Sequence, residues 1–327
     1  MERGLLDPLV FVRTIHFAAT ISVAGVVFFL AFVGEPAFRG DDKSGPIPDL
    51  VRSHLAMITW ISLGLVVVTG AVWLVLLAEQ ISELPVTAIF SEGIVWSVLS
   101  GTDFGYDWIA RLVLTVLLVG ILLPFGTTVR ITSSWKGTLA VLLAACLVGA
   151  LAFAGHAAAG SGIEGAIHLT ADILHLVAAA AWVGALVPLA ILLHVAWGRR
   201  HQQSIKIARE ATLRFSALGM ESVGTLLATG IINSWVLAGS VPALIGTDYG
   251  LLLLVKVALF LVMLSIAAVN RLWLTPGLVQ ELDAPARQDV LRQLRNNSLI
   301  EASAGAIILF IVGVLGTLPP GLHEQAS

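Results

Sequence analysis

Eight long apolar stretches alternate with short polar segments along the chain. The stretches lie near residues 10–33, 55–78, 108–126, 137–155, 169–197, 213–237, 250–270 and 299–318. A helix needs roughly 20 apolar residues to cross a bilayer core of about 30 Å. None of the stretches alternates apolar and polar positions as the strands of a membrane barrel do. The pattern predicts an all-α polytopic membrane protein with eight transmembrane helices in a single transmembrane domain, 1–327.

The composition excludes several other classes of protein. Of the 327 residues, 57% are hydrophobic and only 12% are charged, and the mean hydropathy is +0.95. An ordinary soluble domain is about one quarter charged. The net charge of −3 and the lack of a basic run argue against nucleic acid as a partner. The single cysteine excludes a disulfide framework and a paired-cysteine metal site.

Basic residues predict how the chain is oriented in the membrane. Fourteen of the 18 lysines and arginines fall in every second connection, namely 34–54, 126–137, 198–214 and 271–298. The alternate connections, 79–107, 156–168 and 238–249, hold none. Because cytoplasmic loops are enriched in lysine and arginine, the basic connections should face the cytoplasm. Both termini are therefore expected to be periplasmic.

The two halves of the chain share several glycine, threonine and charged positions. The matched positions are His16 and His175, Gly25 and Gly184, Gly64-x4-Thr69-Gly70 and Gly224-x4-Thr229-Gly230, Gly101-Thr102-Asp103-Phe104-Gly105 and Gly246-Thr247-Asp248-Tyr249-Gly250, and Arg111 and Lys256. These matches predict a 4+4 duplication, with repeat 1 at about 10–155 and repeat 2 at about 169–318. Since each repeat has four spans, the repeats should be parallel and related by an axis along the membrane normal.

Histidines gather towards the predicted periplasmic face. They are His16, His156, His168 and His175. His168, Asp172 and His175 are spaced i, i+4, i+7, which places them on one helical face. Imidazole is the commonest metal ligand in proteins, and a carboxylate often orients such a ligand. We predict a metal site of these four histidines, with Asp172, Lys256 and Arg111 around it. A histidine within a membrane span can instead act only as a hydrogen-bonding strut.

Several of these segments resemble the copper resistance protein D (CopD) family of bacterial inner-membrane proteins. They are Arg13-Thr14-Ile15-His16, Gly155-His156-Ala157-Ala158, His168-x3-Asp172-x2-His175, Gly246 to Gly250 with Lys256, and Asn270-Arg271. The resemblance covers about 10–318. It implies movement of copper across the bacterial inner (cytoplasmic) membrane, with the four matched histidines on the copper path. It also implies a separate periplasmic copper-binding partner of the CopC type.

Three functional hypotheses remain open at this point. The leading one is a copper-binding transport protein whose partners are the copper ion and the lipid bilayer. The alternative is a haem-binding transmembrane electron-transfer protein, in which His16 and His175 are axial ligands of one haem b and Arg111 and Lys256 neutralise its propionates. The third is a structural scaffold without a ligand. No nucleotide or metalloprotease motif occurs, so we expect no catalytic or cofactor-binding residues and no enzyme activity.

Overall fold

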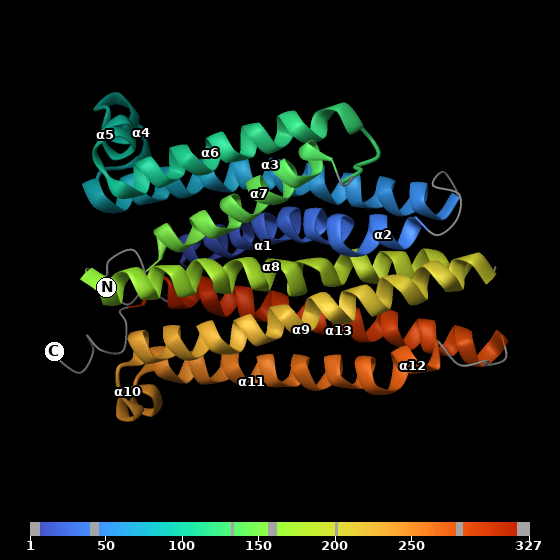
Figure 1. Ribbon diagram of the computed structural model, residues 1–327. Coiled ribbons are helices and arrows are strands. Elements are labelled where there is room, and N and C mark those ends of the chain that lie inside the picture. The colour runs from blue at the N-terminus through green and yellow to red at the C-terminus, as the bar shows by residue number, and fades with distance from the viewer. Residues whose placement is uncertain are drawn as a thin grey trace.

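The computed structural model describes residues 7–39, 46–131, 134–155, 162–199, 202–278 and 284–318, and every regular element in these ranges is a helix (Figure 1). The first half contains α1 (Pro8–Phe29), η1 (Leu30–Gly34), α2 (Glu35–Phe38), α3 (Pro46–Ser82), α4 (Val86–Ser91), α5 (Ile94–Gly101), α6 (Asp103–Leu122), η2 (Leu123–Phe125), α7 (Trp135–Gly149) and η3 (Ala150–Ala154). The second half contains α8 (Gly162–Gly198), α9 (Gln202–Ala238), α10 (Val241–Gly246), α11 (Asp248–Val269), η5 (Asn270–Leu274), α12 (Thr275–Gly277) and α13 (Ala284–Leu315).

Eight of these helical segments are long and apolar enough to cross a membrane, which confirms the predicted number of transmembrane helices. They often exceed the predicted limits, because polar turns at their ends continue the helix. The short helices α4, α5 and α10 were not predicted. They lie at the end of the bundle where α1 begins and α13 ends (Figure 1).

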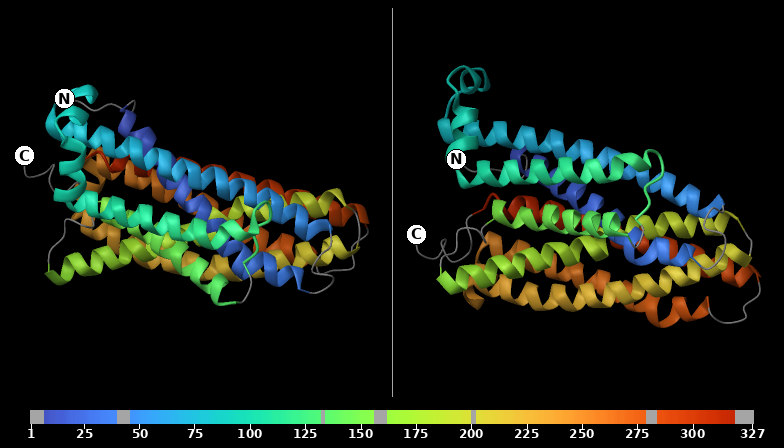
Figure 2. Two further views of the ribbon diagram at one scale, coloured as in Figure 1. Left: turned by 90° about the horizontal axis from the view of Figure 1, so that it is seen from above. Right: turned by 45° about the horizontal axis from the view of Figure 1, so that its top comes forward.

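The helices α1, α8 and α13 form the middle of the bundle. The α3–α6 pair lies on one side of them and the α9–α11 pair on the other, as Figures 1 and 2 show. Helix α1 packs against α3, α7, α8 and α13, while α8 packs most extensively against α9. The two halves of the chain therefore meet along α1 and α8.

The crossing of α1 and α8 depends on two glycines. Gly25 and Gly184 lie against each other, and a methyl group added at Gly184 would stand 2.9 Å from the Cα atom of Gly25 and 2.5 Å from the carbonyl oxygen of Ile21. Small residues allow the backbones of membrane helices to approach closely. These are the two glycines that occupy matching positions in the two halves of the sequence.

The helices α6 and α11 begin in the same way. Thr102 and Thr247 precede them, and each threonine hydroxyl accepts a hydrogen bond from the amide of the glycine three residues later, at 3.0 Å in both cases. These glycines, Gly105 and Gly250, contact the carbonyl groups that end the preceding short helix, so neither has room for a side chain. The shared local geometry is consistent with the duplication, which stays a prediction.

The orientation of the bundle is testable with a reporter. The start of α1 and the end of α13 lie at one end, as an even number of spans requires. Because the connections at the opposite end are the basic ones, a reporter fused after Ser327 should report a periplasmic location. A reporter inserted at 202 should report the cytoplasm, and the reverse pair of results would refute the predicted orientation.

Substitution at the helix crossing should destabilise the bundle. A Gly25→Ala substitution introduces a methyl group against the backbone of α8, so the helices must separate. We expect a loss of about 1–3 kcal/mol in the free energy of unfolding, as overpacking typically costs, measured by denaturant titration in mixed micelles. Gly64→Ala is the matched control, because nothing lies within 4 Å of the added methyl group there. Equal stability of the two variants would contradict the proposed packing.

Candidate metal and ligand site

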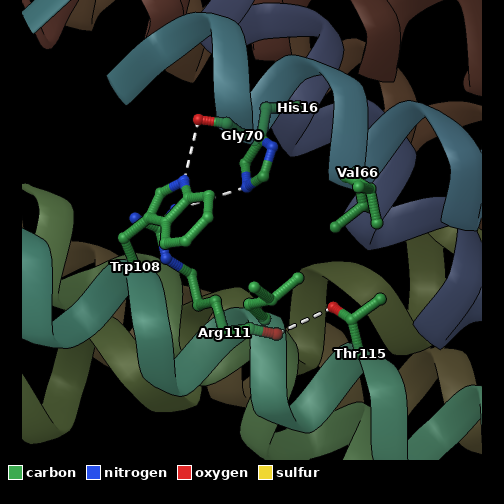
Figure 3. Close-up of a pocket in the computed structure, with 8 residues that line it drawn as sticks. His16, Val66, Gly70, Trp108, Arg111 and Thr115 are labelled. Carbon is green, nitrogen blue, oxygen red and sulfur yellow. Dashed lines mark hydrogen bonds between the residues drawn. The ribbon is translucent and has the colours of Figure 1, made fainter. Parts of the chain in front are cut away.

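The His16 side chain is held between α1, α3 and α6. Its Nδ1 atom lies 2.9 Å from the Thr69 hydroxyl. On the other side of the ring, its Nε2 atom lies 3.2 Å from Nη1 of Arg111 (Figure 3). A guanidinium group can only donate hydrogen bonds, so Nε2 accepts from Arg111 and Nδ1–H donates to Thr69. Gly70 leaves room for the ring, since a Cβ atom there would be 3.4 Å from Cε1 of His16. Both ring nitrogens are therefore engaged by the protein.

Arg111 is the charged group of this first cluster. It forms an ion pair with Asp107 at 2.8 Å, and the two side chains are only 4% and 8% exposed. Its guanidinium also lies 5.2 Å from the centre of the Trp73 ring. The neighbouring pocket, lined by His16, Arg111 and Trp108 (Figure 3), has a volume of about 20 Å³. This is space for little more than one water molecule.

The His175 side chain lies in the second half of the bundle and repeats part of this arrangement. Its Nδ1 atom lies 2.9 Å from the Thr229 hydroxyl, and Gly230 gives the ring room as Gly70 does for His16. Lys256, the counterpart of Arg111, makes no hydrogen bond to the ring among the described residues; it interacts with His175 and Asp172 through its charge. The Nε2 atom of His175 is therefore left open.

A cavity of about 530 Å³ lies beside His175, between α1, α8, α9, α11 and α13. Most of its lining is apolar. Its polar and charged side chains include Arg13, His168, Asp172, His175, Asn233, Tyr249 and Lys256. Asp172 accepts a hydrogen bond from the Asn233 amide at 3.1 Å, which fixes the carboxylate at the wall. Its size falls within the range of small-molecule sites.

The structure groups some of the predicted site residues and separates others. His168, Asp172 and His175 line the same cavity, as their helical spacing predicts. His16 lines the separate small pocket and not this cavity. His156 lies outside the described residues. Within the described ranges, no three histidine, cysteine, aspartate or glutamate side chains are arranged to hold a metal ion.

The haem hypothesis gains no support from this geometry. His16 and His175 line different pockets, and Arg111 occupies the ring nitrogen of His16 that would have to bind the iron. Arg111, predicted to lie around a metal site, instead contacts His16 directly. Lys256 and Asp172 line the cavity beside His175.

Several residues of these sites were not singled out for a role in the sequence. Thr69 and Thr229 appeared only as repeated positions, and their bonds to the histidines require the fold. The pairing of Asp107 with Arg111 has a sequence signal, since the two are four residues apart on one helix. Arg13 was noted only as part of the segment Arg13-Thr14-Ile15-His16 that carries the family resemblance, without a role of its own.

Eight membrane-crossing helices around buried histidines and cations define a multi-pass helical membrane protein. The family model of copper resistance protein D matches residues 209–315, and that of the copper resistance protein D-like N-terminal domain matches residues 5–166. The chain belongs to the copper resistance protein D family, in agreement with the resemblance seen in its sequence.

Individual relatives agree with this assignment. The chain is 34% identical over 236 residues to inner membrane protein YebZ of Escherichia coli (strain K12), covering 72% of this chain and 74% of the relative. It is 28% identical over 310 residues to copper resistance protein D of Pseudomonas syringae pv. tomato, covering 91% and 93%. It is 34% identical over 181 residues to copper transport protein CutJ of Bacillus subtilis (strain 168), covering 55% of this chain and 32% of the relative. With its eight spans, the chain is a multi-pass inner membrane protein.

Loss of the Asp107 carboxylate should destabilise the first cluster. In an Asp107→Asn variant, the buried Arg111 guanidinium keeps its charge but loses its counter-ion. Removing one partner of a buried ion pair costs about 3–5 kcal/mol, and we expect the lower end because asparagine still accepts a hydrogen bond. Asp103→Asn, at the exposed start of the same helix, should cost no more than about 1 kcal/mol. Denaturant titration of both variants measures the difference, and equal losses would show that the ion pair contributes nothing specific.

Proposed function

We propose that this protein moves copper across the inner membrane and binds it first at the histidine side of the 530 Å³ cavity. Two relatives are named for copper resistance and copper transport, which supports copper as the substrate. The observation that carries the proposal for this chain is that His168, Asp172 and His175 face one cavity. We propose no catalytic role for any residue.

The state of the His175 ring supports it as the central copper ligand. Thr229 holds Nδ1, while Nε2 makes no hydrogen bond within the described residues. Copper accepts imidazole nitrogen readily, and two neutral imidazoles bind it without adding negative charge in the membrane. In the proposal, His168 supplies the second imidazole. His156 supplies a third from the segment that precedes α8.

The role of His16 in the proposal depends on Arg111. While Arg111 donates to Nε2, His16 has no free nitrogen for a metal. His16 therefore joins the copper path only in a state in which Arg111 turns back fully to Asp107. A separate periplasmic copper-binding protein of the CopC type remains our proposed donor or acceptor of copper.

Local charge sets a condition on the proposed site. Lys256 and Arg13 line the same cavity as the histidines and repel a metal cation, while Asp172 offsets one of these charges. The neutral form of each imidazole must therefore supply most of the affinity. This condition favours monovalent over divalent copper, because the repulsion grows with the charge of the ion.

Substitution of His175 should remove copper from the purified protein. The full chain is loaded with copper under reducing conditions, desalted and analysed for metal content. We expect His175→Ala to lose the bound copper. Thr229→Val, which removes only the partner of Nδ1, should weaken the affinity by about 10–100-fold, as loss of such an orienting group does.

The matched control for this experiment is His54→Ala. His54 is exposed on α3, and among the described residues its ring bonds to the Leu50 carbonyl group alone, so its loss should leave the metal content unchanged. Copper binding by His175→Ala at the level of the native chain would exclude the proposed site. Absence of copper from the native chain would exclude the proposed function.

A further inference from the structure

Two cations of the large cavity form no ion pair with any carboxylate in the part of the chain that the structure describes. Arg13 is only 8% exposed, its Nε atom makes no hydrogen bond, and no carboxylate of the described residues forms an ion pair with it. Its guanidinium lies 5.0 and 5.9 Å from the centres of the Trp73 and Phe17 rings, and it also lies against Gly316. Among the described residues, the attractive charge interaction of Lys256 is with Asp172, which also accepts a hydrogen bond from Asn233. The cavity therefore carries an excess of positive charge.

The remainder of the cavity suits a hydrocarbon chain. Its wall includes Leu226, Leu253, Phe260, Met263 and Ile308, and most of the lining is apolar. Residues at its edge are both part of the lining and strongly exposed on the outside of the bundle: Ile231 is 70%, Trp235 is 74% and Val241 is 68% exposed. In a membrane, such an apolar edge faces lipid. The cavity is thus open to a ligand that arrives through the bilayer.

We propose that this cavity binds an amphipathic anion from the membrane, with its head group on Arg13 and Lys256 and its acyl chain along the apolar wall. A guanidinium binds carboxylate and phosphate oxygens through paired, charge-assisted hydrogen bonds. A buried cation within a membrane is costly unless an anion or a polar group accompanies it. Bound in this way, the ligand supplies the missing negative charge. It also reduces the repulsion that the two cations exert on any cation at His175, although the proposal does not rest on copper transport.

The head group has two natural sources, which share this chemistry. One is the phosphate of a membrane phospholipid, and the other is the carboxylate of a free fatty acid. Both have one anionic end and an apolar body. The cavity of about 530 Å³ can hold all or part of that body. A neutral molecule with the same chain lacks the interaction with Arg13 and Lys256.

The test compares charged and neutral probes with the same chain. The full protein is purified in a neutral detergent, and binding is measured by native mass spectrometry and by thermal stabilisation. The probes are palmitate against hexadecanol, and palmitoyl lysophosphatidic acid against monopalmitoylglycerol. We expect each anion to bind at least about tenfold more tightly than its neutral partner, as a hydrogen bond to a charged group contributes. Preference for the phosphate identifies a phospholipid, and preference for the carboxylate identifies a fatty acid.

Three variants, compared with one control variant, connect the binding to the cavity. Arg13→Gln and Lys256→Gln should each weaken anion binding by about tenfold or more, while Lys136→Gln, at an exposed lysine of α7, should bind as the native chain does. Ala179→Phe fills the cavity wall and keeps both charges, so it should reduce binding of all four probes. It also keeps the proposal testable if a charge variant fails to fold. Equal affinity for anions and neutral probes, or native affinity in both glutamine variants, would overturn the proposal.

Discussion

The close contact of α1 and α8 at Gly25 and Gly184 determines where the polar groups lie. Neither residue has a side chain, so the two backbones touch and the helices keep a fixed register. His16 and His175 each lie nine residues before the crossing glycine, or about 13 Å along the helix. The two rings therefore lie at similar heights on parallel helices. They face different neighbours, because α1 turns His16 towards α3 and α6 while α8 turns His175 towards α9 and α11.

The two halves of the chain differ in how they accommodate a buried cation. In the first half, Arg111 reaches the histidine, pairs with Asp107 and fills the space between the helices, which leaves a pocket of about 20 Å³. In the second half, Lys256 makes no hydrogen bond to the His175 ring within the described part of the chain, and the cavity beside the ring has a volume of about 530 Å³. Side chains fill the space beside His16, whereas the space beside His175, which α1 also lines, stays open.

The helices could be predicted from the sequence because apolar length is a local property, whereas the pairing of side chains is not. Six- and eight-residue helices such as α4 and α5 are too short to show a pattern. The spacing of His168, Asp172 and His175 fixed their common face, and the cavity lies on that face. The separation of His16 from this group could not be predicted, since spacing along α1 does not tell which helix a face meets. The hydrogen bond between Arg111 and His16 could not be predicted either, because it requires knowing that α1 turns His16 towards α6.

The indole ring of Trp73 lies between two cations, one lining the wide cavity and the other lining the small pocket. It contacts the guanidinium groups of both Arg13 and Arg111, at 5.0 and 5.2 Å from its centre, and each of these cations lines a different pocket. The attraction of a cation to an aromatic face depends on position and on competing charge. Whatever displaces one guanidinium alters the surroundings of the other across a single side chain. Trp73 is thus a single side chain shared by two cations, one from the wide cavity and one from the small pocket.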